Sequence, residues 1–207
     1  MNYVKNMTER YPALAVCEMD VALAIEAVTE CYKNGGKLLL LGNGGSASDA
    51  EHISGELLKG FLSKRPPIDD ELTALSAELG ESAGMLQRGI SAIPLTSLTS
   101  LLSAFANDVS PELVYAQLVY ALGKKCDLAV GLSTSGNSKN VVAALKVAKA
   151  LGIKTLALTG ESGGELADIA DIVIKAPACE TYKVQEYHLP IYHAICAEAE
   201  RIIFENN

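Results

Sequence analysis

A run of four leucines that ends in a glycine cluster constrains the fold of this chain more than any other feature. The stretch at 37–56 reads KLLLLGNGGSASDAEHISGE. Consecutive aliphatic residues that stop abruptly at glycine are typical of a parallel β-strand buried on both faces. We therefore expect a strand here, then a tight turn over Asn43, Gly44 and Gly45. We expect Ser46 to open the following helix and to cap it.

This strand, turn and helix predict a site for an anion or for polar sugar oxygens. First-turn backbone N–H groups and the positive end of the helix dipole point into such a turn, where they bind phosphate. Further along the same helix, His52 and Glu56 are four residues apart and share one face. We therefore expect an acid/base pair or a metal-binding pair near the loop.

Four more short apolar strands follow at the spacing of an α/β domain. They are expected at 92–96, 127–132, 155–159 and 171–176, with helical stretches between them. This alternation predicts one parallel sheet covered on both faces, whose ligands bind beyond the carboxyl ends of the strands. Because the chain has 207 residues, we expect a single domain over 1–207.

Two segments lie outside this pattern. Residues 1–34 contain a helix whose apolar stripe repeats every three or four residues from Leu14 to Tyr32. This stripe either packs on the sheet or contacts another copy of the chain. Residues 62–90 contain no expected strand, and we interpret them as an inserted helical segment. It is a lid, an oligomer contact or a solvated helical hairpin.

A hydroxyl-rich loop, STSGNS at 133–138, follows the strand expected at 127–132. Its hydroxyls and the N–H groups of the next helix converge where the helix dipole is positive, so phosphate can bind there without a lysine. The alternative is that these residues only cap the helix and turn the chain. A second glycine- and serine-rich loop at another strand end favours the ligand site.

The last expected helix carries Gln185 and His193 on either side of Pro190. Eight residues of straight helix separate two side chains by about 12 Å. The two share a site only through a kink at Pro190, long side chains or donation across a subunit boundary. We expect that they do not meet His52 and Glu56 within one chain, and this predicts an oligomer.

Composition argues against several classes of protein. The net charge of −8 argues against nucleic-acid binding, which needs clustered Lys and Arg. No apolar run approaches the roughly 20 residues that span a bilayer. The five cysteines form no C-x-x-C pair, so neither a disulfide framework nor a structural zinc knot is indicated. Because the N-terminus lacks a signal pattern, we expect a cytoplasmic location.

Taken in order, the motifs resemble those of the sugar isomerase (SIS) domain family, and within it those of the phosphoheptose isomerases. They are GNGGSASDAEHxxxE, AND, STSGNS, LTGxxGGxLA and VQExxxxxxH. The resemblance implies a flavodoxin-like, three-layer αβα domain with a five-stranded parallel sheet and an extra N-terminal helix. It also implies a homotetramer with active sites at subunit interfaces.

The resemblance implies roles for particular residues as well. Proton transfer falls to Glu56 and His193. In members that bind zinc, the ligands correspond to His52, Glu56, Gln185 and His193, a set of N and O donors. The substrate contacts correspond to Asn43, Gly44, Gly45, Ser46, Asn107, Asp108, Ser133, Thr134, Ser135, Ser138 and Gln185.

The implied activity is aldose–ketose isomerisation of a sugar phosphate. The leading candidate is conversion of sedoheptulose 7-phosphate into D-glycero-D-manno-heptose 7-phosphate through an enediol. Such chemistry needs a base and stabilisation of charge on oxygen. Two alternatives stay open: a non-catalytic SIS protein that binds a phosphosugar or a regulatory partner, and an isomerase or lyase of another phosphosugar. A non-catalytic relative is expected to lose Glu56 or His193, and this chain has both.

Overall fold

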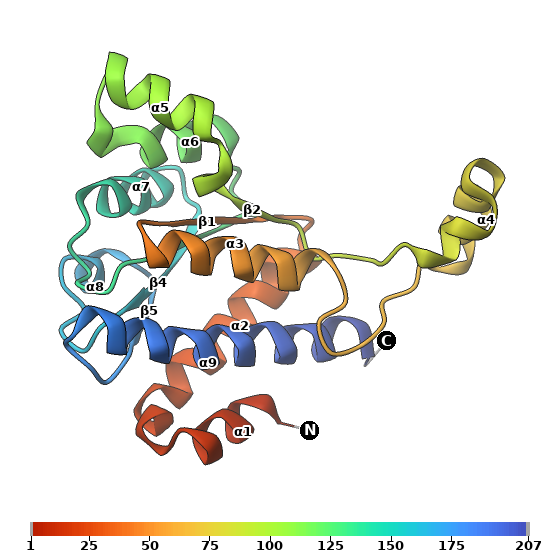
Figure 1. Ribbon diagram of the computed structural model, residues 1–207, viewed down its shortest axis with the longest axis horizontal. Coiled ribbons are helices and arrows are strands. Elements are labelled where there is room, and N and C mark those ends of the chain that lie inside the picture. Colours follow the sequence, from red (N-terminus) through yellow and green to blue (C-terminus); the bar gives the residue numbers. More distant parts are fainter. Residues whose placement is uncertain (1, 206–207) are drawn as a thin grey trace.

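One parallel β-sheet lies between two layers of helices in the computed structural model, which describes residues 2–205 (Figure 1). The strand order is β2-β1-β3-β4-β5, and every neighbouring pair is parallel. This arrangement confirms the expected three-layer, flavodoxin-like α/β fold. The strands are β1 (Leu38–Gly42), β2 (Ala92–Pro94), β3 (Leu128–Leu132), β4 (Lys154–Thr159) and β5 (Ile172–Lys175).

The leucine run forms β1, next to the centre of the sheet. Because successive side chains of a strand point to opposite faces, Leu38 and Leu40 enter one hydrophobic core. Leu39 and Leu41 enter the other. The strand is therefore buried on both faces, as the sequence predicted.

Each core is closed by its own set of helices. The first lies under α2 (Glu18–Lys33), α3 (Gly45–Leu58) and α9 (Thr181–Glu200). The second lies under α5 (Thr99–Asp108), α6 (Val114–Leu122), α7 (Lys139–Ala150) and α8 (Leu166–Ile169). Short turns of 3₁₀ helix at Leu95–Ser97 and Pro111–Leu113 and a π-helical turn at Arg201–Glu205 complete the pattern.

The N-terminal stripe packs on this chain's own sheet. Residues 3–33 form α1 (Tyr3–Arg10), a 3₁₀ turn (Pro12–Cys17) and then α2. Leu14, Val21 and Val28 are buried in the core under α2, α3 and α9. The structure therefore favours the first of the two alternatives for this stripe.

The middle of the segment at 62–90 is helical and lies apart from the sheet, whereas Arg65 and Ile90 near its ends are buried. It contains α4 (Asp69–Leu79) and a 3₁₀ turn (Gly80–Met85), which project from the body of the molecule (Figure 1). None of the residues of α4 is buried. Its role as a lid or an oligomer contact stays a prediction. Within residues 2–205, the structure contains no helix with the length and apolar character of a membrane span.

The loop after β3 depends on a glycine. Gly136 has φ +68°, and a β-carbon there would overlap the carbonyl oxygen of Gly163.

We expect Gly136→Ala to lower the free energy of unfolding by more than Gly152→Ala does. Gly152 has a similar φ of +72°, but a β-carbon added there would meet no atom closer than 3.8 Å. The Gly152→Ala variant therefore loses only about 1–3 kcal/mol of stability, to backbone strain. Urea unfolding of both variants measures the difference, and equal losses would contradict this account of the loop.

Candidate active site

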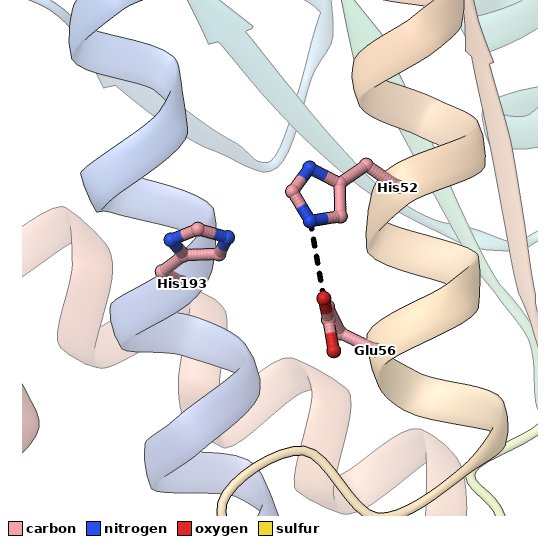
Figure 2. A group of neighbouring side chains, drawn as sticks. All are labelled: His52, Glu56 and His193. Atoms are coloured by element: carbon pink, nitrogen blue, oxygen red, sulfur yellow. Dashed lines mark hydrogen bonds and ion pairs between the residues drawn. The ribbon is translucent and has the colours of Figure 1, made fainter.

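Three side chains that can move a proton or bind a metal ion meet between α3 and α9 (Figure 2). The ligand atoms of His52, Glu56 and His193 lie within 4.8 Å of one another. His52 Nε2 is 3.1 Å from Glu56 Oε1. The expectation that His193 does not meet the other two within one chain is therefore wrong. The reason is that α3 and α9 pack side by side on the same face of the sheet, so no partner chain is needed to bring these three together.

A chain of hydrogen bonds fixes the orientation of His52. The Tyr192 hydroxyl donates to Asp49 Oδ1 at 3.3 Å and lies 2.9 Å from His52 Nδ1. The 2.9 Å contact is a hydrogen bond whose donor depends on the tautomer of the His52 ring. The Nε2 atom of the same ring faces the Glu56 carboxylate.

His193 is held neutral at this position. Burial, and then the proximity of His52, lower the pKa of His193 below its usual value. Its Nε2 atom is buried and has no hydrogen-bond partner among residues 2–205. A neutral imidazole with an unpartnered nitrogen is suited to bind a metal ion or to exchange a proton.

Glu56 lies between two basic groups. Its Oε1 faces His52, while its Oε2 accepts a hydrogen bond of 3.2 Å from Lys59 Nζ. Both partners come from α3 or its C-terminal end, at spacings of four and three residues that place side chains on one helix face. The ammonium of Lys59 therefore partly offsets the carboxylate charge.

The loop after β1 differs from the sequence prediction at its helix start. Helix α3 begins at Gly45, and its N-cap is Gly44, with φ +55°. The carbonyls of Asn43 and Gly44 already accept from the N–H groups of Ser46 and Ala47. Ser46 is buried inside the first turn, and the helix has no side-chain cap. The prediction that Ser46 caps the helix is therefore wrong, because the glycine turn lets backbone carbonyls do this instead.

The two polar loops lie side by side because their strands are neighbours. Gly42 and Leu132 are paired in the register of β1 and β3, so both loops leave the sheet at its carboxyl edge. The side-chain amides of Asn43 and Asn140 bond to each other reciprocally, at 2.8 and 2.9 Å. This pair joins the loop after β1 to the start of α7.

Two of the four predicted hydroxyls in the loop after β3 lie in contact, and the phosphate site itself stays a prediction. The Oγ atoms of Ser133 and Ser138 are 2.9 Å apart. The carbonyl of Thr134 accepts from the N–H of Gly160. Ser135 is exposed, and its Oγ accepts from the N–H of Asn137. Several of these groups thus stabilise the loop. Ser138 is the N-cap residue of α7, but its side chain makes no capping hydrogen bond.

The chain matches known proteins in both sequence and fold. Two family models, both described as SIS domain, match residues 92–197 and 2–91. The chain belongs to the SIS domain family. A phosphoheptose isomerase from Roseiflexus sp. is 41% identical over 187 residues, which cover 90% of this chain and 83% of the relative.

Solved structures of SIS proteins agree with this assignment. A phosphoheptose isomerase from Neisseria gonorrhoeae has a TM-score of 0.70 and 33% identity, covering 94% of this chain and 90% of that one. The enzyme from Francisella tularensis has a TM-score of 0.75 and 28% identity, covering 96% and 95%. The predicted resemblance to the SIS family and its phosphoheptose isomerases is confirmed.

Other predicted site residues of this SIS chain lie away from the three-residue cluster. A β-carbon on Gly45 would be 2.6 Å from Gln185 Nε2, so this amide lies against the first turn of α3. Asn107 and Asp108 are exposed at the end of α5, where they bond to each other. Helix α5 covers the sheet face opposite α9 (Figure 1), so this chain alone does not bring the pair to His193.

A cavity of about 360 Å³ opens beside His193. Its walls come from α1, α9 and the segment at 61–62, and they include Arg10 and Phe61. The Phe61 ring lies 5.4 Å from the His193 ring, centroid to centroid. His193, one of the three residues of the cluster, therefore borders a space large enough for a small polar molecule.

Sequence reasoning missed four residues that shape this SIS site. Asp49 is part of the quoted motif and lies three residues before His52, a helical spacing that could have indicated its role. Tyr192 was interpreted only as part of an apolar helix face. The other two are Lys59, whose three-residue spacing from Glu56 is also helical, and Asn140, for which no sequence pattern gave a signal.

Of the three histidines in the chain, His188 is structural and gives acid sensitivity. It is fully buried on α9 and lies 3.2 Å from the carbonyl oxygen of Thr159. Burial lowers the pKa of His188 to about 4, whereas unfolded histidine titrates near 6.5. Only the unfolded state binds this proton between these values, so stability should fall by about 3 kcal/mol as the pH drops from 6.5 to 4.

Urea unfolding across this pH window measures the effect. His188→Gln should flatten the pH dependence even where the variant is less stable at pH 7. An unchanged slope in the variant would show that His188 is not the group responsible.

Proposed function

We propose that this protein is an aldose–ketose isomerase that converts sedoheptulose 7-phosphate into D-glycero-D-manno-heptose 7-phosphate. The observation that carries the proposal is the His52, Glu56 and His193 cluster, in a chain 41% identical to a protein named phosphoheptose isomerase. An acid/base set beside a cavity is what an isomerase needs and a binding protein does not.

The reaction transfers a proton between neighbouring carbons through an enediol. Glu56 is the proposed base that removes the proton from C1 of the ketose and returns it to C2. The N–H of neutral His193 would donate to the oxygen on which charge develops.

The proposed phosphate site is the pair of loops at the carboxyl edge. Seven residues of α3 separate Gly45 from His52, which corresponds to about 10 Å of rise. An extended chain advances about 1.2 Å per bond, so the eight bonds from C1 to the phosphorus of a heptose 7-phosphate span about 10 Å. A seven-carbon substrate that begins at the loops therefore spans the part of α3 up to His52, four residues before the proposed base Glu56.

We also propose that the cluster binds zinc. His52, Glu56 and His193 supply N and O donors of the kind that zinc prefers. The hydrogen bond of His52 Nδ1 to Tyr192 is the support that metal-binding histidines usually have. When bound, the ion would supply positive charge to polarise a substrate oxygen. The Gln185 amide lies against Gly45, in the first turn of α3. Its role as a further zinc ligand therefore stays a proposal.

Purified protein should isomerise sedoheptulose 7-phosphate, and Glu56→Gln and His193→Gln should each lower kcat by about 10²- to 10⁴-fold. Product formation at C2 is measured by NMR in deuterated water. Glu30→Gln is the control variant. Glu30 is an exposed carboxylate on α2 that forms an ion pair with Lys154 of β4. Near-wild-type turnover in both site variants would overturn the mechanism.

Metal content tests the zinc proposal separately. We expect about one zinc ion per chain by elemental analysis, and loss of that ion in His52→Gln. Chelation should lower turnover, and added zinc should restore it. A chelated protein that keeps full activity would exclude a catalytic role for the metal.

We further propose a homotetramer in the cytoplasm. Exposed apolar side chains on one side of the N-terminal region support association, namely Val16, Met19 and Leu23. All five cysteines are free thiols, as is usual in a reducing compartment. Light scattering should give a mass of about 87 kDa, four times the 21.8 kDa of one chain. A fully active monomer would contradict the tetramer.

A further inference from the structure

We propose that the buried pair of Arg65 and Glu200 is a positioning device that sets the distance between Glu56 and His193. The inference rests on the proposed isomerase function. Arg65 and Glu200 lie in none of the predicted site motifs. Their side chains are 0% and 1% exposed, and Arg65 Nε is 2.7 Å from Glu200 Oε1.

Glu200 anchors the segment that follows α3. Its carboxylate accepts from the backbone N–H groups of Phe61, Leu62 and Ser63, at 2.8, 2.7 and 3.1 Å. With Arg65 Nε, this makes four donors on one carboxylate. Because Glu200 lies on α9 seven residues after His193, about two turns further, the segment is fixed to the helix that carries His193.

Arg65 reaches in the other direction, to the helix that carries Glu56. Its Nη1 donates to the carbonyl of Leu57 at 2.7 Å, and its Nη2 is 3.4 Å from the carbonyl of Glu56 itself. The guanidinium also lies over the Phe204 ring, 4.7 Å from its centroid. One planar side chain thus holds the last turn of α3 and the end of α9 together.

The consequence for the site is geometric. The pair links the backbone at Glu56 to the helix of His193 and holds Phe61 against the His193 ring. A buried ion pair adds little net stability compared with apolar residues of similar size. Its effect is therefore expected in the placement of Glu56 and Phe61 relative to His193.

Arg65→Lys and Arg65→Met test the proposal in the full-length protein. Arg65→Lys keeps the positive charge but removes the planar fork, and Arg65→Met removes both. Measured well below the melting temperature and normalised to folded protein, kcat should fall about 10- to 100-fold in both variants, with KM unchanged. A purely structural role would lower the melting temperature without this split between kcat and KM.

Asp127→Asn is the matched control. Asp127 is also a buried carboxylate, which accepts from Lys37 Nζ and from the backbone N–H groups of Lys37 and Lys124. It lies just before β3, at the opposite end of the sheet from the loops. This variant should lose stability but keep its kcat.

Histidine NMR separates failure of this inference from failure of the proposed function. The chain has three histidines, so their ring signals can be assigned with single variants. Arg65→Met should shift the signals of His52 and His193 and leave those of His188 unchanged. Shifted signals in a protein without isomerase activity would support the positioning and overturn the function, whereas unchanged kcat and unchanged signals would overturn the positioning.

Discussion

The packing of α3 against α9 is the constraint on which the candidate site depends. Helix α3 leaves the sheet at β1, whereas α9 follows β5 at the edge, three strand positions away. Neighbouring strands are about 4.8 Å apart, so α9 must cover about 14 Å across the sheet to reach α3. Its 20 residues give about 30 Å of helix. The 12 residues from Thr181 to His193 account for about 18 Å of this length, so His193 lies far enough along α9 to reach α3.

Patterns with a fixed period predicted the fold and much of the site. The leucine run, the strand spacing and the N-terminal stripe all follow from burial on a sheet, and the structure has each of them. His52 and Glu56 were predicted to act together because four residues of helix bring side chains onto one face. The hydroxyls of the loop after β3 were predicted because strand ends in such sheets meet at one edge.

What sequence could not predict depends on contacts between distant segments. The meeting of His193 with Glu56 requires the angle and height at which two helices pack, and no local pattern encodes these. The roles of Tyr192 and Arg65 likewise arise only once α9 lies on α3. At Ser46 a local pattern gave a wrong prediction. Serine is a good capping residue, but Gly44 adopts a positive φ and occupies the N-cap position instead.

The separation of the polar loops from the cluster also has an electrostatic meaning. With a phosphate dianion at the loops, the eleven residues of α3 from Gly45 to Glu56 give about 16 Å of rise, and in a water-like medium this distance would limit the effect on Glu56 to about 0.5 kcal/mol, compared with about 2 kcal/mol at 4 Å. Ions in solution would screen it further. The loops offer hydroxyls and amides, and the basic side chain that contacts the Glu56 carboxylate from the end of α3 is Lys59. In the proposed arrangement the substrate's charge lies far enough from the proposed proton-transferring groups to disturb them little.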